Sequence, residues 1–96
     1  MAQKLTDLMT KESQWTQGAF ARLPSGKACL ANHADAVSCC LIGGIQRCYH
    51  EGPDRTEAMR MLKARFSGSI TLFLDWHDAP DRKFVEVRAL IEELSL

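Results

Sequence analysis

A run of small and apolar residues at helical spacing in the middle of the chain constrains the fold most. Its members recur every third or fourth position: Val37, Cys40, Leu41, Gly44, Ile45 and Cys48. This spacing places them on one face and predicts an amphipathic helix over Val37–Cys48. Gly43 and Gly44 each cost a helix about 1 kcal/mol relative to alanine. We therefore expect another element to cross very close to these glycines, and this helix to be the central one.

Two further helices are predicted on either side of it. Apolar residues at helical spacing predict a short helix over Leu5–Ser13, with Trp15 just beyond its end. After Gly52-Pro53, the segment Asp54–Glu57 matches a capping box, in which an acceptor side chain is followed three residues later by a carboxylate. We expect a helix from there to about Phe66, with Arg55 on its solvated side.

The segment Ser69–Trp76 fits two structures. Its apolar residues alternate as in a strand, yet Ser69 is a fair N-cap and several of the same residues suit a helical turn. We favour a short buried helix. A last helix is predicted to open with Asp78 at its N-cap and Pro80 in its first turn. Its inner face would carry Phe84, Val87, Leu90, Ile91 and Leu94.

A small β-hairpin is predicted after the first helix. Ala19–Leu23 and Lys27–Ala31 flank Pro24-Ser25-Gly26, which has the composition of a tight turn. The expected fold is therefore mainly α, a compact bundle of four to five short helices with this hairpin. With 96 residues, the chain is long enough for a single domain over residues 1–96.

Charge and hydropathy exclude several classes of partner. Twelve Lys and Arg residues balance twelve Asp and Glu residues, so we expect no nucleic-acid partner, which normally requires a basic excess. The longest apolar run, Ile70–Leu74, is far shorter than the ~20 residues of a membrane span. The N-terminal segment lacks the apolar stretch of a signal peptide. We therefore expect a cytoplasmic protein whose four cysteines are reduced.

Three segments resemble motifs of one family. The C-terminal Trp76–Arg82 segment, with Glu86-Val87 and Leu90-Ile91 after it, resembles the pattern Trp-Asn-Asp-x-x-x-Arg-Thr-x-x-Glu-Val-x-x-Leu-Leu. That pattern is found in a family of small uncharacterised bacterial and phage-borne proteins. Ala36–Ile45 is similar to the family's Trp-Cys-x-x-Gly-Ala-Leu helix, and Trp15-x-x-Gly18 with Ala21-Arg22 to its N-terminal stretch. The resemblance implies a shared fold and no assigned activity.

The sequence departs from these family motifs at three positions. Cys39 stands where the family usually has Trp, His77 where it has Asn, and Lys83 where it has Thr. No chemistry that depends on these positions is carried over from the family.

A polar cluster near the start of the predicted last helix is the candidate binding site. It consists of Trp76, His77, Asp78, Arg82 and Glu86. Asp78, Arg82 and Glu86 follow one another at steps of four and would share one helix face. The cluster could bind a ligand. The alternative, which we favour, is structural: an N-cap aspartate, an arginine bridging two carboxylates, and a tryptophan closing the edge of the core.

The cysteines and histidines allow a metal hypothesis. The candidate ligands for Zn²⁺ are Cys29, His33, Cys39, Cys48 and His50. No Cys-x-x-Cys pair is present, and Cys48 shares the apolar helix face with Cys40, where a free thiol packs as a small hydrophobe. We therefore expect buried thiols, no metal site and no cofactor.

A nucleophilic cysteine paired with a histidine is a further alternative. Cys39 or Cys40 could pair with His33, His50 or His77, but nothing in the sequence selects a pair. Cys40 is predicted to lie well inside its helix, away from the helix N-terminus that would activate a thiol. We expect no catalytic residue and favour a protein that is not an enzyme.

The favoured function is a non-enzymatic protein–protein interaction module of unidentified partner, with self-association as one option. A second hypothesis is a phage or mobile-element inhibitor that blocks a protein surface of a host system. A third is a small metal-binding protein built on its cysteines and histidines.

Overall fold

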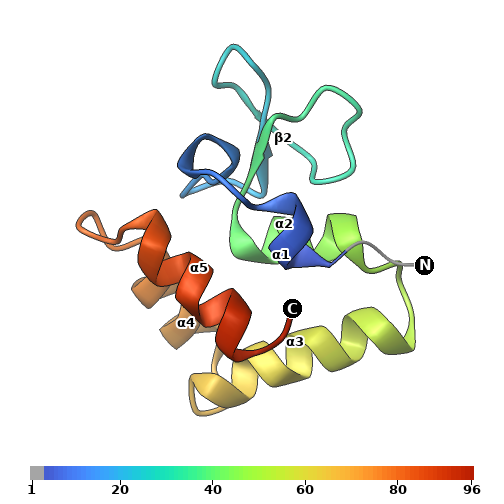
Figure 1. Cartoon of the computed structure of the whole chain (residues 1–96), viewed down its shortest axis with the longest axis vertical. Helices are drawn as coiled ribbons and strands as arrows, with labels where there is room; N and C mark the ends of the chain where they lie inside the picture. The colour runs from blue at the N-terminus through green and yellow to red at the C-terminus, as the bar shows by residue number, and fades with distance from the viewer. Residues whose placement is uncertain (1–3) are drawn as a thin grey trace.

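The computed structural model describes residues 4–96, which form five α-helices, one short 3-10 helix and three two-residue strands (Figure 1). In chain order the elements are α1 (Leu5–Leu8), η1 (Glu12–Gln14), β1 (Ala21–Arg22), β2 (Ala28–Cys29), β3 (Ser38–Cys39), α2 (Leu41–Cys48), α3 (Pro53–Arg65), α4 (Ile70–His77) and α5 (Phe84–Glu93). The predicted mainly helical fold with a small hairpin is confirmed. Among residues 4–96, none of the helices has the length and apolar character that crossing a membrane requires.

The predicted hairpin is present and carries a third strand that the sequence analysis missed. β1 pairs antiparallel with β2 on one side and with β3 on the other, so the strand order is β2-β1-β3. The residues of β3 were predicted to be the first turns of the central helix. That prediction is wrong, because Ser38 and Cys39 pair with Arg22 and Ala21, and Val37 is exposed.

The glycine pair in α2 does mark a close crossing. A Cβ atom on Gly43 would overlap the backbone carbonyl oxygen of Phe20 and lie 2.9 Å from its carbonyl carbon. A Cβ atom on Gly44 would overlap the side chain of Leu5 and lie 3.3 Å from the sulfur of Met9. The segment before β1 and helix α1 thus both pack on the glycine face of α2, which confirms the expected close approach.

The predicted first helix, Leu5–Ser13, is split in two. α1 ends at Leu8, and Met9 leaves the helical conformation with φ −102° and ψ 75°. The backbone N–H groups of Thr10 and Lys11 then donate to the side-chain oxygen of Gln14, at 2.8 and 3.0 Å. Because this side chain satisfies donors that a continuous helix would have paired with carbonyls, a short separate turn, η1, follows α1.

Helix α3 begins one residue earlier than its predicted cap. Pro53 occupies the first helical position and Gly52 the N-cap, with φ 140°, so Asp54 lies inside the first turn and caps nothing. Proline suits this position because its missing N–H would have no partner there. Arg55 was expected to be solvated, but it donates to the carbonyl oxygens of Tyr49 and Gln46 at 2.9 and 2.8 Å.

The ambiguous segment after α3 is a helix, as favoured. The hydroxyl of Ser69 caps α4 by accepting from the N–H of Leu72 at 3.2 Å. Only one face of α4 is buried: Phe73 and His77 point inward, whereas Leu72 and Leu74 are exposed.

The N-cap of the last helix lies at Lys83, five residues later than the predicted Asp78. Asp78 is the C-cap of α4, where its N–H donates to the carbonyl of Leu74 at 2.8 Å, so the predicted N-cap role is wrong. α5 begins at Phe84, and the carboxylate of Glu86 accepts from the N–H of Lys83 at 2.9 Å. The side chain of Asp78 is engaged elsewhere, which leaves Glu86 to satisfy the donors at the start of α5.

The core lies between the helices, below the sheet and its loops in Figure 1. All five α-helices contribute to its largest fully buried side chains: Leu5, Met9, Leu41, Ile45, Leu62, Phe73, His77, Val87 and Ile91. Eight of these nine are apolar, and His77 is the single titratable side chain among them. A buried imidazole requires hydrogen-bond partners, which directs attention to its surroundings.

Candidate functional site

A cavity of about 310 Å³ lies where the segment before β1 meets the start of α2 and the end of α4. The residues that line it are Gly18, Ala19, Phe20, Cys40, Ile42, Phe73, Leu74, His77 and Asp78. Its walls are mostly apolar, and its polar side chains are a thiol, an imidazole and a carboxylate. A mainly apolar cavity with a few polar groups is the usual form of a ligand site.

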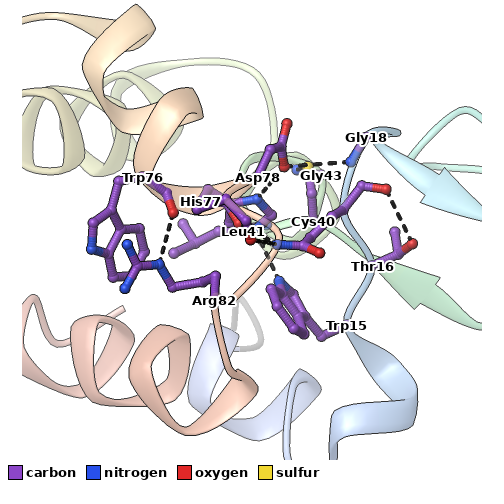
Figure 2. Close-up of polar contacts among 12 residues, drawn as sticks. Trp15, Thr16, Gly18, Cys40, Leu41, Gly43, Trp76, His77, Asp78 and Arg82 are labelled. Atoms are coloured by element: carbon purple, nitrogen blue, oxygen red, sulfur yellow. Dashed lines mark hydrogen bonds and ion pairs between the residues drawn. The ribbon is translucent and has the colours of Figure 1, made fainter.

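His77 is buried beside this cavity and both of its ring nitrogens are engaged (Figure 2). Nε2 accepts hydrogen bonds from the indole N–H of Trp15 at 2.9 Å and from the backbone N–H of Leu41 at 3.3 Å. Two donors on Nε2 assign the proton to Nδ1, which lies 2.7 Å from Asp78 Oδ1 and donates to it. Burial lowers the pKa of His77, and Asp78 only partly opposes this, so the ring is neutral at neutral pH.

Asp78 lies at the cavity rim without a lysine or arginine within ion-pair distance among the described residues. Its Oδ1 accepts from His77 and, at 3.4 Å, from the N–H of Gly18. Its side chain is 40% exposed. Within residues 4–96, His77 is its only side-chain partner within ion-pair distance, and that ring is neutral. Within the described residues, no lysine or arginine therefore lies within ion-pair distance of this carboxylate, which stands beside apolar walls.

Gln17 and Trp15 fasten the segment before β1 to the end of α4. The side-chain amide of Gln17 donates to the carbonyl oxygens of His77 and Ala79, at 2.8 and 2.9 Å. Trp15 meets the edge of His77 with the ring centroids 5.6 Å apart. Trp15 lies in a family-like motif, whereas Gln17 and the cavity wall residue Phe20 carried no signal in the sequence. The partners of Gln17 lie about 60 residues away, and Phe20 meets Cys40 and Gly43, which no spacing rule relates to it.

Cys40 stands at the N-cap of α2 rather than well inside the helix, so its predicted position is wrong. The helix starts later because Ser38 and Cys39 belong to β3. The sulfur of Cys40 accepts from the N–H of Gly43 at 3.2 Å. A helix N-terminus normally favours a thiolate. Burial outweighs that effect here and raises the pKa of Cys40, so its thiol stays protonated at neutral pH.

Cys40 and His77 do not form a nucleophile–base pair. They line the same cavity, but in the part of the chain that the structure describes no hydrogen bond joins them. The Nε2 lone pair of His77 is already shared between two N–H donors, and its other nitrogen carries a proton directed at Asp78. The ring therefore has no free base to offer the thiol.

The five residues of the predicted binding cluster divide between two places. His77 and Asp78 line the cavity, whereas Trp76 and Glu86 border a smaller cavity of about 210 Å³. Arg82 belongs to the second place. Its guanidinium lies 4.1 Å from the ring centre of Trp76 and donates to the Trp76 carbonyl at 2.7 Å (Figure 2). It also pairs with Glu86 at 2.9 Å. Arg82 was expected to bridge two carboxylates, but among residues 4–96 its ion pair is with Glu86, because Asp78 and Arg82 both precede α5 and do not share a helix face.

The predicted metal ligands are scattered. His33 and His50 are exposed, Cys29 is half-buried on β2, and Cys39 and Cys48 are buried. Among residues 4–96, no three His, Cys, Asp or Glu side chains lie close enough to hold a metal ion. Burial raises the pKa of Cys39, and raises that of Cys48 to about 11, so both are protonated thiols at neutral pH.

A larger groove of about 690 Å³ runs along α3. Arg55, Arg60 and Lys63 line it, but Arg55 is bound to backbone carbonyls and Arg60 to Glu57. Two of its three cations are thus already bound within this chain, whereas the cavity beside His77 combines apolar walls with a thiol, an imidazole and a carboxylate.

Comparison with known proteins gives one match. Residues 3–95 match the sequence model of DUF6197, which is described as a family of unknown function. Neither a curated protein nor a solved structure matches the chain.

Proposed function

Because the chain belongs to DUF6197, a family of unknown function, its activity has to be inferred from the site itself, and we propose a non-enzymatic module that binds another protein. The observation that carries this proposal is the apolar cavity beside His77, whose walls extend outward into exposed apolar side chains. Phe20 and Leu74 line the cavity and are 49% and 40% exposed. Large apolar groups gathered at a concave site are typical of protein-binding surfaces.

The chemistry of the cavity also favours binding over catalysis. Its thiol is kept neutral by burial, and its imidazole is neutral with both nitrogens hydrogen-bonded. A catalytic base needs a free lone pair, and a catalytic cysteine needs a lowered pKa. These polar groups instead fix the cavity walls, because His77 joins the start of α2 to the segment before β1.

We place this module in the cytoplasm. Its four cysteines are free thiols, which suits a reducing compartment.

The test uses three tagged forms of the chain: the wild type and two variants. It compares the proteins that each form captures in cells of the source organism. Leu74→Lys puts a charge on the cavity wall, and we expect it to lower the enrichment of a specific partner about tenfold or more, as for a residue at an interface centre. Leu30→Lys is the matched control, since Leu30 is 69% exposed and does not line the cavity. Sedimentation of the three purified forms measures self-association, and so tests whether the partner is a second copy of the chain. Equal losses in both variants, or equal retention in both, would contradict the proposal.

A further inference from the structure

We propose that the partner segment entering the cavity beside His77 carries a positive charge next to an apolar side chain, and that Asp78 pairs with this charge. The inference rests on the proposed binding function and adds the chemistry of what is bound.

The first step is the unbalanced charge of Asp78. Within the described residues, its one partner within ion-pair distance is His77, at 2.7 Å, and that imidazole is neutral because its Nε2 accepts from two N–H donors. The carboxylate is half-exposed, so a group that arrives from outside can reach it. Its bonds with His77 and Gly18 hold it at the cavity rim before any partner binds.

The second step is the contrast with the smaller cavity beside Trp76. Two carboxylates line that cavity, Glu86 and Glu93, and each has a cation from this chain: Arg82 at 2.9 Å and Arg65 at 2.7 Å. That site is therefore balanced internally. The cavity beside His77 has one carboxylate and no lysine or arginine among its lining residues.

The third step is the shape and polarity of the walls. The cavity volume of about 310 Å³ is at the lower end of the range for ligand sites. Phe20, Phe73 and Leu74 offer an apolar surface that suits an aromatic or aliphatic side chain. A segment with such a side chain followed by lysine or arginine satisfies the apolar walls and the carboxylate together, whereas an acidic neighbour would be repelled.

The experiment uses three capped dipeptides that differ only in charge: acetyl-Phe-Lys-amide, acetyl-Phe-Gln-amide and acetyl-Phe-Glu-amide. Each is titrated into the ¹⁵N-labelled full chain, and backbone shifts at Phe20, Leu74 and Asp78 are followed by NMR. We expect the lysine peptide to bind about threefold or more tightly than the glutamine peptide, as for a partly exposed ion pair, and the glutamate peptide to bind most weakly.

Asp78→Asn should remove this order and give three equal affinities. Asparagine keeps an oxygen that accepts from His77, so the fold around the ring is preserved. Asp75→Asn is the matched control, because Asp75 lies on the same helix, is exposed and does not line the cavity. It should keep the wild-type order.

Two results would overturn the inference. Equal binding of the three peptides to the wild-type chain, with shifts at Phe20 and Leu74, would remove the charge preference and leave the cavity as a binding site. No shift at the cavity with any peptide would also reject the inference. The capture comparison of Leu74→Lys with Leu30→Lys would then decide separately on the proposed function.

Discussion

A single imidazole joins three parts of this molecule. His77 accepts from Trp15 and from the start of α2, and it donates to Asp78 at the end of its own helix. The sequence included His77 and Asp78 in a predicted polar cluster, because residues close together in the sequence can be recognised locally. It could not reveal the indole of Trp15 as a partner, since the two residues are 62 positions apart and no spacing rule relates them.

This arrangement predicts a loss of stability in acid. Burial lowers the pKa of His77 below its ordinary 6.5. As the pH falls through about 6.5 towards the lowered value, the unfolded chain takes up a proton that the folded chain does not, so the free energy of unfolding decreases over this window. Below the pKa of His77 in the folded chain, the contribution of His77 to the free energy of unfolding no longer changes with pH. Urea unfolding at a series of pH values from 7.5 to 5 measures it.

Substitution isolates the contribution of His77. His77→Gln leaves some of the donors around the ring unpaired, and should cost about 1–3 kcal/mol at neutral pH. It should also flatten the pH dependence relative to the wild type. His50→Gln is the matched control, since His50 is exposed, and should keep the wild-type profile. An unchanged profile in His77→Gln would show that other groups cause the acid loss.

At the scale of the element, the sequence predicted the middle of α2 better than its start. The apolar spacing and the glycine pair describe Leu41–Cys48 correctly. Val37 fits the same spacing by coincidence, because the chain there is extended and the side chain is 52% exposed. A strand of two residues is too short for alternation to be visible, so β3 could be recognised only from its pairing with β1.

The start of α5 was mispredicted for a related reason. Asp78-Ala79-Pro80 has the composition of a helix N-terminus, and so does the stretch around Lys83 and Glu86. The choice between them depends on contacts distant in sequence: the Asp78 carboxylate is held by Gly18 as well as by His77. Local signals cannot include that contact.

The two glycines of α2 should differ in how they tolerate alanine. Gly43 faces the backbone of Phe20, which cannot move without shifting the segment that leads into β1. Gly43→Ala should therefore lower the free energy of unfolding by about 2–3 kcal/mol, despite the higher helix propensity of alanine. Gly44 faces the tip of the Leu5 side chain, which can shift more readily than a backbone carbonyl. Gly44→Ala should cost less than about 1 kcal/mol. Urea denaturation of both variants checks this, and equal losses would contradict the assigned contacts.

At the scale of the whole molecule, the helices and the sheet are held in different ways. The two ends of the described chain meet inside the helical part, where the N–H of Leu5 donates to the carbonyl of Leu96 at 2.8 Å and the Tyr49 hydroxyl donates to the same oxygen at 3.2 Å. The sheet has only two-residue strands, which are not stable alone. Its attachment to the end of α4 therefore matters for its order.

The sequence predicted the helices and turns of this molecule better than it predicted how they pack together. Helical periodicity and turn composition are local properties, so the fold class followed from them. The cavity beside His77 is formed by three segments that lie far apart in sequence, and Phe20, Cys40 and Leu74 come together only after folding. Candidate residues such as His77 could be named in advance, whereas the walls around them could not.

The attachment of the sheet leads to a prediction about local opening. Gln17 donates two hydrogen bonds to the carbonyls of His77 and Ala79, at 2.8 and 2.9 Å. Gln17→Ala removes both and should raise the hydrogen-exchange rate roughly tenfold at the amides of Val37 and Cys40, which pair with the segment around β1. Amides in the middle of α3 should be unaffected, since its contacts are with the helical core.

Gln46→Ala is the matched control, because Gln46 takes part in the hydrogen bonds of the described residues only through its backbone. A uniform rise over the whole chain would mean that the sheet opens only when the molecule unfolds.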